Sequence, residues 1–517
     1  MQNYKINITA FLVLVQLISF NGFAQTLATV GNDTISVKEF KTRFELTPKS
    51  NSKYEIDSIK IDFLYTMIAE KLWAFEGKKY GFQNNPFVQN SILDIEKKLL
   101  RDKLYKEKIE KKINISRKEI DSDLKKIHKK LILNFLFDKN KISISKLYNR
   151  LKAGANFDSL LLERKEFSKQ KNGIPIVFGD MNKKLEDKVY SLKPGMFTKP
   201  IPIDNGWTIY YLKNIEYVKS IPKFKGKSDD KIVHDVIFDR KASVLYHKYY
   251  AKHISNKVVN VDKKLFSKLF TVIRNLFEQR GKKLFNNKNS KYSINYSAAM
   301  QIKSGFTDKN LKSEFIKFKE SPISLKQFIY DVAINGFTIP KVDSIEIRRK
   351  LSSRVKKFIL DELLAREAVK SISVNSRDIR KEVKMWEDSF IASYYRKTFL
   401  DSIKVDNSEI QKFYLKVKSQ IPDSIKNQHD LINDKIKSGI YFQKLKEFYN
   451  DKTVELAQDY GFSINRKLLN SIKVSQVEML VYRYLGFGGS ITAVPYLHPF
   501  YEWKNLRLKK FNSRIKD

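Results

Sequence analysis

The stretch 131–218 carries the clearest pattern of apolar and polar positions in the chain. It opens on a short apolar run at 131–137 and continues with an amphipathic, helix-like segment at 146–157. A segment punctuated by Gly and Pro leads to a long loop at 192–201, and an aromatic, β-branched run follows at 206–212. Runs of that composition are typical of strands. The order strand, helix, helix, strand in fewer than 90 residues predicts one small α+β domain.

Helical patterns flank this stretch. Residues 87–153 contain no Gly or Pro, and apolar residues recur there at steps near three and four. They are Ile92, Ile95, Leu99, Ile109 and Ile113. This spacing predicts one apolar face of a long helix. Ser36 with Glu39, and Ser116 with Glu119, fit the capping box that begins a helix.

Four phrases of the first half return in the second half at a nearly constant distance. The pairs are 35–40 with 323–328, 67–72 with 359–364, 118–120 with 408–410, and 152–157 with 437–442. Their offsets are 288, 292, 290 and 285 residues. Chance similarity among helices rich in Lys, Ile and Leu is the alternative. The constant spacing favours an internal repeat, in which a second helical module spans about 315–420.

Composition narrows the class of protein. A chain of 517 residues with 42% hydrophobic residues predicts two to four folded domains. Lys and Arg number 99 against 57 Asp and Glu, a formal charge of +42. A nucleic-acid binder is one interpretation of that excess. The lysines alternate with carboxylates, so solvated helix faces are favoured. The absence of Cys excludes disulfides, a lipid-modified Cys and a thiol nucleophile.

The N-terminus has the pattern of a secretory signal peptide at 1–24. Lys5 supplies the positive charge, 8–20 is a short, interrupted apolar run, and 22–24 offers small residues for cleavage after Ala24. The run is too short to favour a spanning helix, and no later segment qualifies as one. We therefore expect an exported, soluble, periplasmic protein without an integral membrane segment or a nucleic-acid partner. Mass spectrometry of protein from the native host is expected to find an N-terminus at or near Gln25.

Several phrases of the central stretch resemble a parvulin-type (PpiC-like) peptidyl-prolyl isomerase domain. They lie at 151–157, 179–181, 185–189, 192–195 and 206–209. The opening strand-like pair and capping box at 27–40 are similar to the N-terminal segment of SurA-like exported foldases. The resemblance implies an α+β fold, with mostly helical chaperone modules and one small parvulin-like domain inserted.

The expected domains follow from these patterns. They are a signal peptide at 1–24, a helical chaperone-like segment at 25–126, a parvulin-like domain at 127–219, a helical connecting region at 220–314, a second helical module at 315–420 and a C-terminal region at 421–517. The last is expected to hold a degenerate isomerase-like piece and an aromatic tail.

The resemblance also implies a site. Family domains carry two His and an Asp or Cys in a hydrogen-bonded cluster. In this chain Asn134 and Thr208 stand at the His positions, and Ile174 stands at the Asp or Cys position. Asn134 and Thr208 are expected to bond each other or a bound carbonyl. Neither side chain changes charge near neutral pH, as His does.

The apolar part of the family pocket is retained. Met181 is kept, Leu185 replaces a Phe, and Phe178 fills an aromatic position before them. The alternative is that these three are ordinary core residues. No cofactor is expected, and the spacing of His234, His247 and His253 fits no metal site. Two functions stay open: an exported isomerase and chaperone for unfolded envelope or outer-membrane proteins, or an inactive parvulin-like chaperone that only binds such clients.

Overall fold

The computed structural model describes residues 25–49, 55–164, 172–281, 292–371, 377–420, 428–475, 480–497 and 500–507. The predicted signal peptide lies outside them. The chain forms two compact units. One contains 105–257, and the other combines the segment up to Leu104 with the segment from Val258 onward. Helices predominate and the sheets are small, so the predicted α+β class with mostly helical modules is confirmed.

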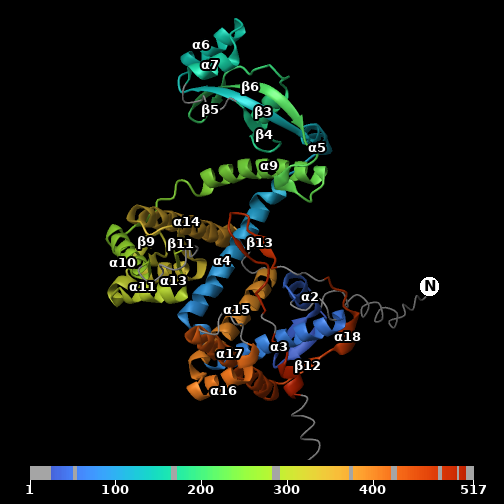
Figure 1. The fold of residues 1–517 in the computed structure, drawn as a ribbon, viewed down its shortest axis with the longest axis vertical. Coiled ribbons are helices and arrows are strands. Elements are labelled where there is room, and N and C mark those ends of the chain that lie inside the picture. Colours follow the sequence, from blue (N-terminus) through green and yellow to red (C-terminus); the bar gives the residue numbers. More distant parts are fainter. Residues whose placement is uncertain are drawn as a thin grey trace, which may run out of the picture. The chain divides into compact units, whose positions relative to one another are not determined.

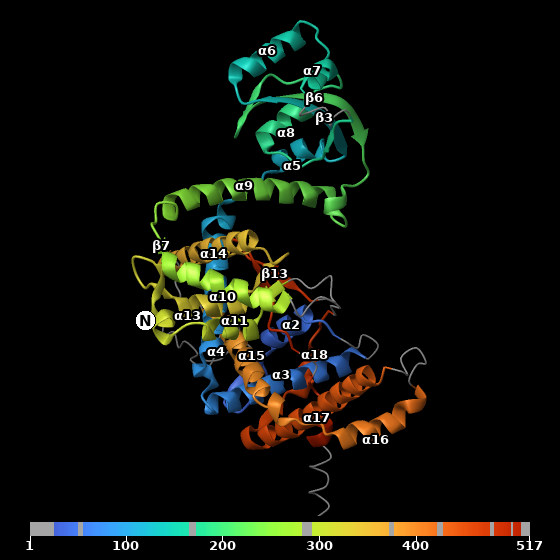
Figure 2. The same ribbon diagram turned by 60° about the vertical axis from the view of Figure 1, so that its left-hand side comes forward.

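The 105–257 unit is built on a four-stranded antiparallel sheet in the order β4-β3-β6-β5. Its elements are η2 (Glu110–Lys112), α5 (Arg117–Leu124), β3 (Lys129–Asp138), α6 (Lys141–Lys152), α7 (Phe157–Glu163), β4 (Ile174–Ile176), α8 (Lys183–Tyr190), β5 (Ile201–Ile203), β6 (Gly206–Tyr217), η4 (Pro222–Phe224) and α9 (Asp229–His253). Helices α6 and α7 cover one face of the sheet, and α8 covers the other (Figure 2). Two apolar clusters fill these two layers.

Helices α5 and α9 also belong to this unit, so the unit includes residues on both sides of the expected domain at 127–219. The buried ring of Phe178 packs among Val233, Val236 and Ile237 of α9. The expected connecting region at 220–314 is therefore wrong as one piece. Its first part, α9, belongs to the core of this unit, and its later helices belong to the other unit.

The other unit contains two series of elements (Figure 1). The first series is β1 (Thr26–Val30), β2 (Asp33–Ser36), α2 (Val37–Leu46), α3 (Ile56–Lys79), η1 (Phe82–Asn84) and α4 (Pro86–Lys108). The second is β9 (Glu314–Lys317), β10 (Ile323–Ser324), α13 (Leu325–Asn335), β11 (Phe337–Ile339), α14 (Ser344–Ser371), α15 (Arg377–Lys397), η5 (Leu400–Ser402), α16 (Asn407–Val417), η6 (Lys418–Gln420), α17 (His429–Tyr460), β12 (Phe462–Ile464) and α18 (Arg466–Ser471). Between them lie β7 (Asn260–Val261), α10 (Lys263–Gly281), β8 (Tyr292–Ile294), α11 (Tyr296–Ser304) and α12 (Asp308–Lys312).

Two three-stranded sheets of this unit match residue by residue. In one, β1 pairs with β2 and with β12; in the other, β9 pairs with β10 and with β7. The pairs Ala28–Ile35 and Ala28–Ile464 correspond to Ile316–Ile323 and Ile316–Val261. The offset is 288 residues for β1 and β2, and 203 residues for the third strand. Both sheets also shift register before the N-cap serine, Ser36 or Ser324. These agreements support the predicted repeat.

The third strand of each sheet comes from the other series. Strand β12, near the end of the second series, joins β1, and β7, which follows the first series and the 105–257 unit along the chain, joins β9. The helices are exchanged in the same way, because α3 packs on α15 and α4 packs on α14. At the first crossing a Cβ on Gly77 would lie 2.6 Å from Cγ2 of Ile391, so only Gly allows this approach.

Buried charge and an aromatic core fix the α3–α15 pair. Burial acts to raise the pKa of Asp388, but Lys71, Lys384 and Lys78 lower it to about 2. The Asp388 carboxylate accepts from Lys78 Nζ at 2.6 Å and from Lys71 Nζ at 3.3 Å. Nearby, the buried Trp73 indole donates to Thr453 Oγ1 of α17 at 2.7 Å. This hydrogen bond joins α17 of the second series to α3 of the first.

The expectation of a degenerate isomerase-like piece at 421–517 is wrong. The first described element of the region, separated from Gln420 by eight residues, is the 32-residue helix α17, and β12, α18 and a short hairpin follow it. The predicted echo of 152–157 at 437–442 is a chance similarity, since Gly154 ends a helix with φ +95° and Gly439 lies inside α17. The aromatic tail folds back as a hairpin of β13 (Tyr482–Tyr484) and β14 (Ser490–Thr492), in which Arg483 pairs with Asp102 and Glu382.

Candidate functional site

The polar residues predicted for the parvulin-like site do not meet. In β3, Asn134 lies directly opposite Tyr211 of β6, so these two side chains share one face of the sheet. Asn134 is fully buried there and its Nδ2 donates to Asp158 Oδ1 of α7 at 3.2 Å. Its Oδ1 has no partner among the described residues. This is the face covered by α6 and α7, where Tyr211 stacks on Phe157.

Thr208 lies on the opposite face. It pairs across the sheet with Phe137, three residues from Asn134, and successive residues of a strand alternate between faces. Its neighbour on that face is Tyr210, whose pKa is raised by burial while the Thr208 side chain acts to lower it. The expectation that Asn134 and Thr208 bond each other is therefore wrong, because the sheet itself stands between them.

The apolar residues fall into two groups. Met181 and Leu185 lie in the cluster on the Thr208 face, with Leu133, Tyr210 and Leu212. Ile174 pairs with Leu133 across the sheet and so faces the same side, where it is 38% exposed. Phe178 does not join them, since its ring is fully buried against α9. The face keeps an apolar wall of Met181, Leu185 and Ile174, and its one predicted polar group is the Thr208 hydroxyl.

A buried ion network holds this wall in place, and sequence reasoning missed it. Glu186 of α8 is fully buried and accepts from Arg240 of α9 at 2.7 Å and from the Gly179 amide at 2.8 Å. Arg240 also donates to the Met181 carbonyl at 2.8 Å. Asp123 of α5, fully buried, pairs with Lys183 at 2.8 Å. The network joins α5, α8 and α9, so the pocket wall depends on helices outside the predicted domain.

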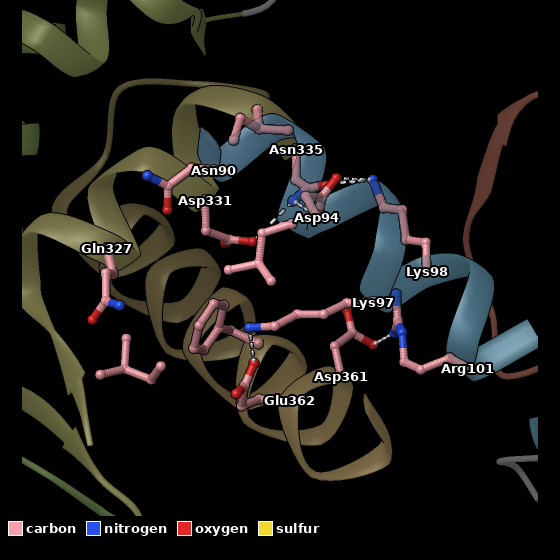
Figure 3. Close-up of a pocket in the computed structure, with 14 residues that line it drawn as sticks. Asn90, Asp94, Lys97, Lys98, Arg101, Gln327, Asp331, Asn335, Asp361 and Glu362 are labelled. Atoms are coloured by element: carbon pink, nitrogen blue, oxygen red, sulfur yellow. Dashed lines mark hydrogen bonds and ion pairs between the residues drawn. The ribbon is translucent and has the colours of Figure 1, made fainter. Parts of the chain in front are cut away.

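The second candidate region is a partly open cleft in the other unit, between α4 on one side and α13 and α14 on the other. Figure 3 shows charged side chains reaching across it. Lys97 Nζ lies 2.6 Å from Glu362 Oε2, and Arg101 pairs with Asp361. These are contacts between the two series of elements. The sequence indicated the helices but gave no means of pairing them.

An adjoining part of the same cleft is more apolar. Leu93 and Leu100 of α4 and Ala365 and Val369 of α14 line it, with lysines and glutamates around them. Leu93 is 42% exposed and Val369 is 52% exposed. Exposed branched side chains that line a cleft are a surface on which an apolar segment of another chain can bind.

Asp331 gives the cleft a titratable group. Burial raises the pKa of Asp331 to about 6, with Asp94 and Asp361 acting in the same direction and Arg354 and Asn335 against it. Its carboxylate accepts from Asn335 Nδ2 at 2.9 Å and pairs with Arg354. The folded protein therefore holds this proton more tightly than the unfolded chain does.

A pH-dependent stability follows. The free energy of unfolding is expected to fall as pH rises from about 4, the unfolded pKa, to about 6, the folded pKa. Relative to Asp331→Asn, the wild type should lose on the order of 2–3 kcal/mol across that window. Urea denaturation at a series of pH values measures the difference. Asp308→Asn removes an exposed carboxylate and is the control; because it keeps Asp331, its pH profile should match that of the wild type. Parallel pH profiles for wild type and Asp331→Asn would contradict the expectation.

Two further classes of feature are absent from the described ranges. These ranges hold no group of three or more His, Asp or Glu side chains placed to bind a metal ion. Nor do they include a helix with the length and apolar character needed to cross a membrane.

Comparison with known proteins gave structural matches. No family model matches the chain, and no curated protein matches it. Among solved structures, it is similar to the peptidylprolyl isomerase PrsA of Bacillus cereus, with 17% identity, 46% of this chain and 95% of that one covered, and a TM-score of 0.22. A SurA-like chaperone structure from Campylobacter jejuni shares 20% identity over 45% and 99%, with a TM-score of 0.21. PrsA of Bacillus subtilis shares 15% over 47% and 97%, with a TM-score of 0.16. These proteins are of the class that the sequence resembles.

Proposed function

We propose that this protein is a chaperone of the parvulin isomerase type that binds unfolded polypeptides, and that its 105–257 unit isomerises prolyl bonds poorly or not at all. One observation carries the proposal: Asn134 and Thr208 face opposite sides of the sheet. Rotation of a prolyl amide has a barrier of ~18–20 kcal/mol. Lowering it requires polar groups beside the apolar pocket that favour the twisted amide, and Thr208 alone is a weak substitute for the family cluster.

The cleft between α4 and α14 supports the binding function. Its apolar part exposes Leu93 and Val369, while Lys97, Arg366 and Lys370 stand around it. Glu96, Glu320 and Glu362 line the same part, and both Lys97 and Arg366 are paired with Glu362. A preference for clients with acidic segments therefore rests on the net charge of +42 of the whole chain.

Export and the clients belong to the same proposal. The signal-like N-terminus supports secretion to the periplasm, where the clients would be unfolded or partly folded envelope and outer-membrane proteins. A signal of this kind combined with a client-binding cleft fits a protein that assists other exported chains before they fold.

Suppression of aggregation tests the binding function. Purified protein should prevent aggregation of an unfolded outer-membrane protein at near-stoichiometric ratio, measured by light scattering. The double variant Leu93→Glu, Val369→Glu should need several-fold more protein for the same effect, because charge in the cleft opposes binding of apolar segments. Ile345→Glu changes a 79% exposed residue of the same helix α14 away from the cleft and is the matched control. Equal suppression by both variants would exclude the cleft as the client site.

Prolyl isomerisation is the second candidate function. It is favoured by the apolar wall of Met181, Leu185 and Ile174, which shares a face with Thr208. The direct rate measurement described in the Discussion separates the two candidates.

A further inference from the structure

The packed helix pair α5–α9 shows which side chains bind to a helix pair of this kind in this protein. Asp123 and Lys126 at the end of α5, and Val236 and Arg240 on α9, form a face that is covered within the 105–257 unit. The ring of Phe178 packs on the apolar part of this face. Glu186 and Asp187 of α8 pair with the cations, since Arg240 binds Glu186 and Lys126 binds Asp187. The occupant is an aromatic side chain beside carboxylates.

The pair α16–α17 is built in the same way. Both α5 and α16 begin with a capping box, at Ser116 and at Asp406. A glutamate of that box is held by a lysine of the partner helix in each case. Glu119 lies 2.6 Å from Lys241, and Glu409 lies 2.5 Å from Lys444.

The two pairs also agree in their cores. Ile120 packs near Val233 and Ile237 in one pair, and Ile410 packs with Ile436 and Ile440 in the other. The offset is 290 residues for the first helix and 203 for the second, the latter being the offset found for β7 and β12. The same offsets therefore locate on α16–α17 the face that corresponds to the covered one.

Among the residues that the structure describes, none covers that corresponding face. It consists of Phe413, Lys416, Gly439 and Gln443, which stand at the positions of Asp123, Lys126, Val236 and Arg240. All four are exposed, and Phe413 is 38% exposed although it neighbours the apolar cluster of this hairpin. The cation Lys416 is retained, and Phe413 adds apolar surface where the first pair has a carboxylate.

We propose that this face, which we call the α16–α17 face, binds client segments that present an aromatic side chain beside carboxylates. The proposal rests on the proposed chaperone function and adds a second client site with its own preference. The covered face sets the occupant, because Phe178, Glu186 and Asp187 occupy the equivalent positions there. The charge of this helix pair also favours an acidic segment, since lysines outnumber carboxylates seven to four on the described residues of 407–447.

The test uses the full chain and a short fluorescein-labelled peptide with one Phe flanked by Glu residues. Fluorescence anisotropy should show binding by the wild type. Phe413→Glu should weaken it at least about tenfold, equivalent to about 1.4 kcal/mol. Lys416→Glu should weaken binding of this peptide far more than that of a version with Gln in place of Glu. Circular dichroism checks that each variant is folded.

Leu415→Glu is the matched control. Leu415 is 71% exposed and lies two positions from Phe413, about 200° around helix α16, so its change should alter the dissociation constant by less than about twofold. A peptide with Ser in place of Phe should bind weakly to every variant.

Three results would overturn the inference. One is equal peptide affinity in wild type and Phe413→Glu. Another is self-association of the wild type, seen by sedimentation, that Phe413→Glu abolishes, since the face would then bind a second copy. The third is unchanged suppression of client aggregation in Phe413→Glu, which would leave the proposed chaperone function intact. Absence of suppression by the wild type would instead count against the chaperone function itself.

Discussion

The wild-type protein is expected to isomerise a short prolyl peptide roughly 10²–10⁴-fold more slowly than a parvulin with a complete polar cluster. This deficit corresponds to roughly 2.7–5.5 kcal/mol of lost transition-state stabilisation. The reason is geometric, because Asn134 faces α7 and Thr208 faces the opposite layer of the unit. Two-dimensional exchange NMR of the peptide measures the rate without a coupling protease.

Two double variants examine the geometry directly. Asn134→His with Thr208→His places two imidazoles on opposite faces and should give no gain. Phe137→His with Thr208→His places them directly across the sheet on one face, where they can share a hydrogen bond, and should be the faster enzyme. A wild-type rate equal to that of a complete parvulin would refute the proposal. A gain in the Asn134 variant but not in the Phe137 variant would show that the register is different.

Arg240→Met is expected to destabilise the 105–257 unit by roughly 3–5 kcal/mol, because it removes the cation that lies 2.7 Å from the buried carboxylate of Glu186. Hydrogen exchange of peptides from β3 and β6, followed by mass spectrometry, reports on this unit alone. Arg117→Met breaks an exposed pair with Asp230 between α5 and α9 and is the control, because an exposed ion pair contributes little to stability and the exchange should stay near that of the wild type.

The network also predicts non-additivity. Glu186→Gln combined with Arg240→Met should cost less than the sum of the single changes, because each removes a charge that the other leaves unpaired. Equal exchange in Arg240→Met and Arg117→Met would mean that water reaches Glu186 and that the ion network contributes little to the stability of the unit.

The sequence predicted the elements better than their partners. Apolar periodicity located α4, and the capping-box pattern located the starts of α2 and α5, because these signals are local. The repeat spacing likewise identified equivalent elements. It did not show that β1 pairs with β12 instead of β7, since the two third strands occupy equivalent positions in their series. Partner choice depends on packing between residues hundreds of positions apart.

The prediction that Asn134 and Thr208 bond each other was wrong for a related reason. Whether Asn134 and Thr208 meet depends on the register of β3 against β6, and a shift of one residue moves a side chain to the other face. Phrase similarity places residues on a strand without fixing that register. Phe178 was assigned to the pocket because α9, which buries it, begins fifty residues further along the chain. The core alternative was correct for Phe178.

The exchange of third strands determines the order in which the protein can be completed during synthesis. Strands β1 and β2 are synthesised before the other described strands. Their sheet lacks its third strand until β12 (Phe462–Ile464) has been made, more than 400 residues later. The 105–257 unit needs no later segment and can close while the rest is still being made. During that interval the nascent chain has an unpaired strand edge and the bare apolar surface of α3. During synthesis, folding of the unit that contains β1 would therefore depend on protection of these surfaces until β12 has emerged.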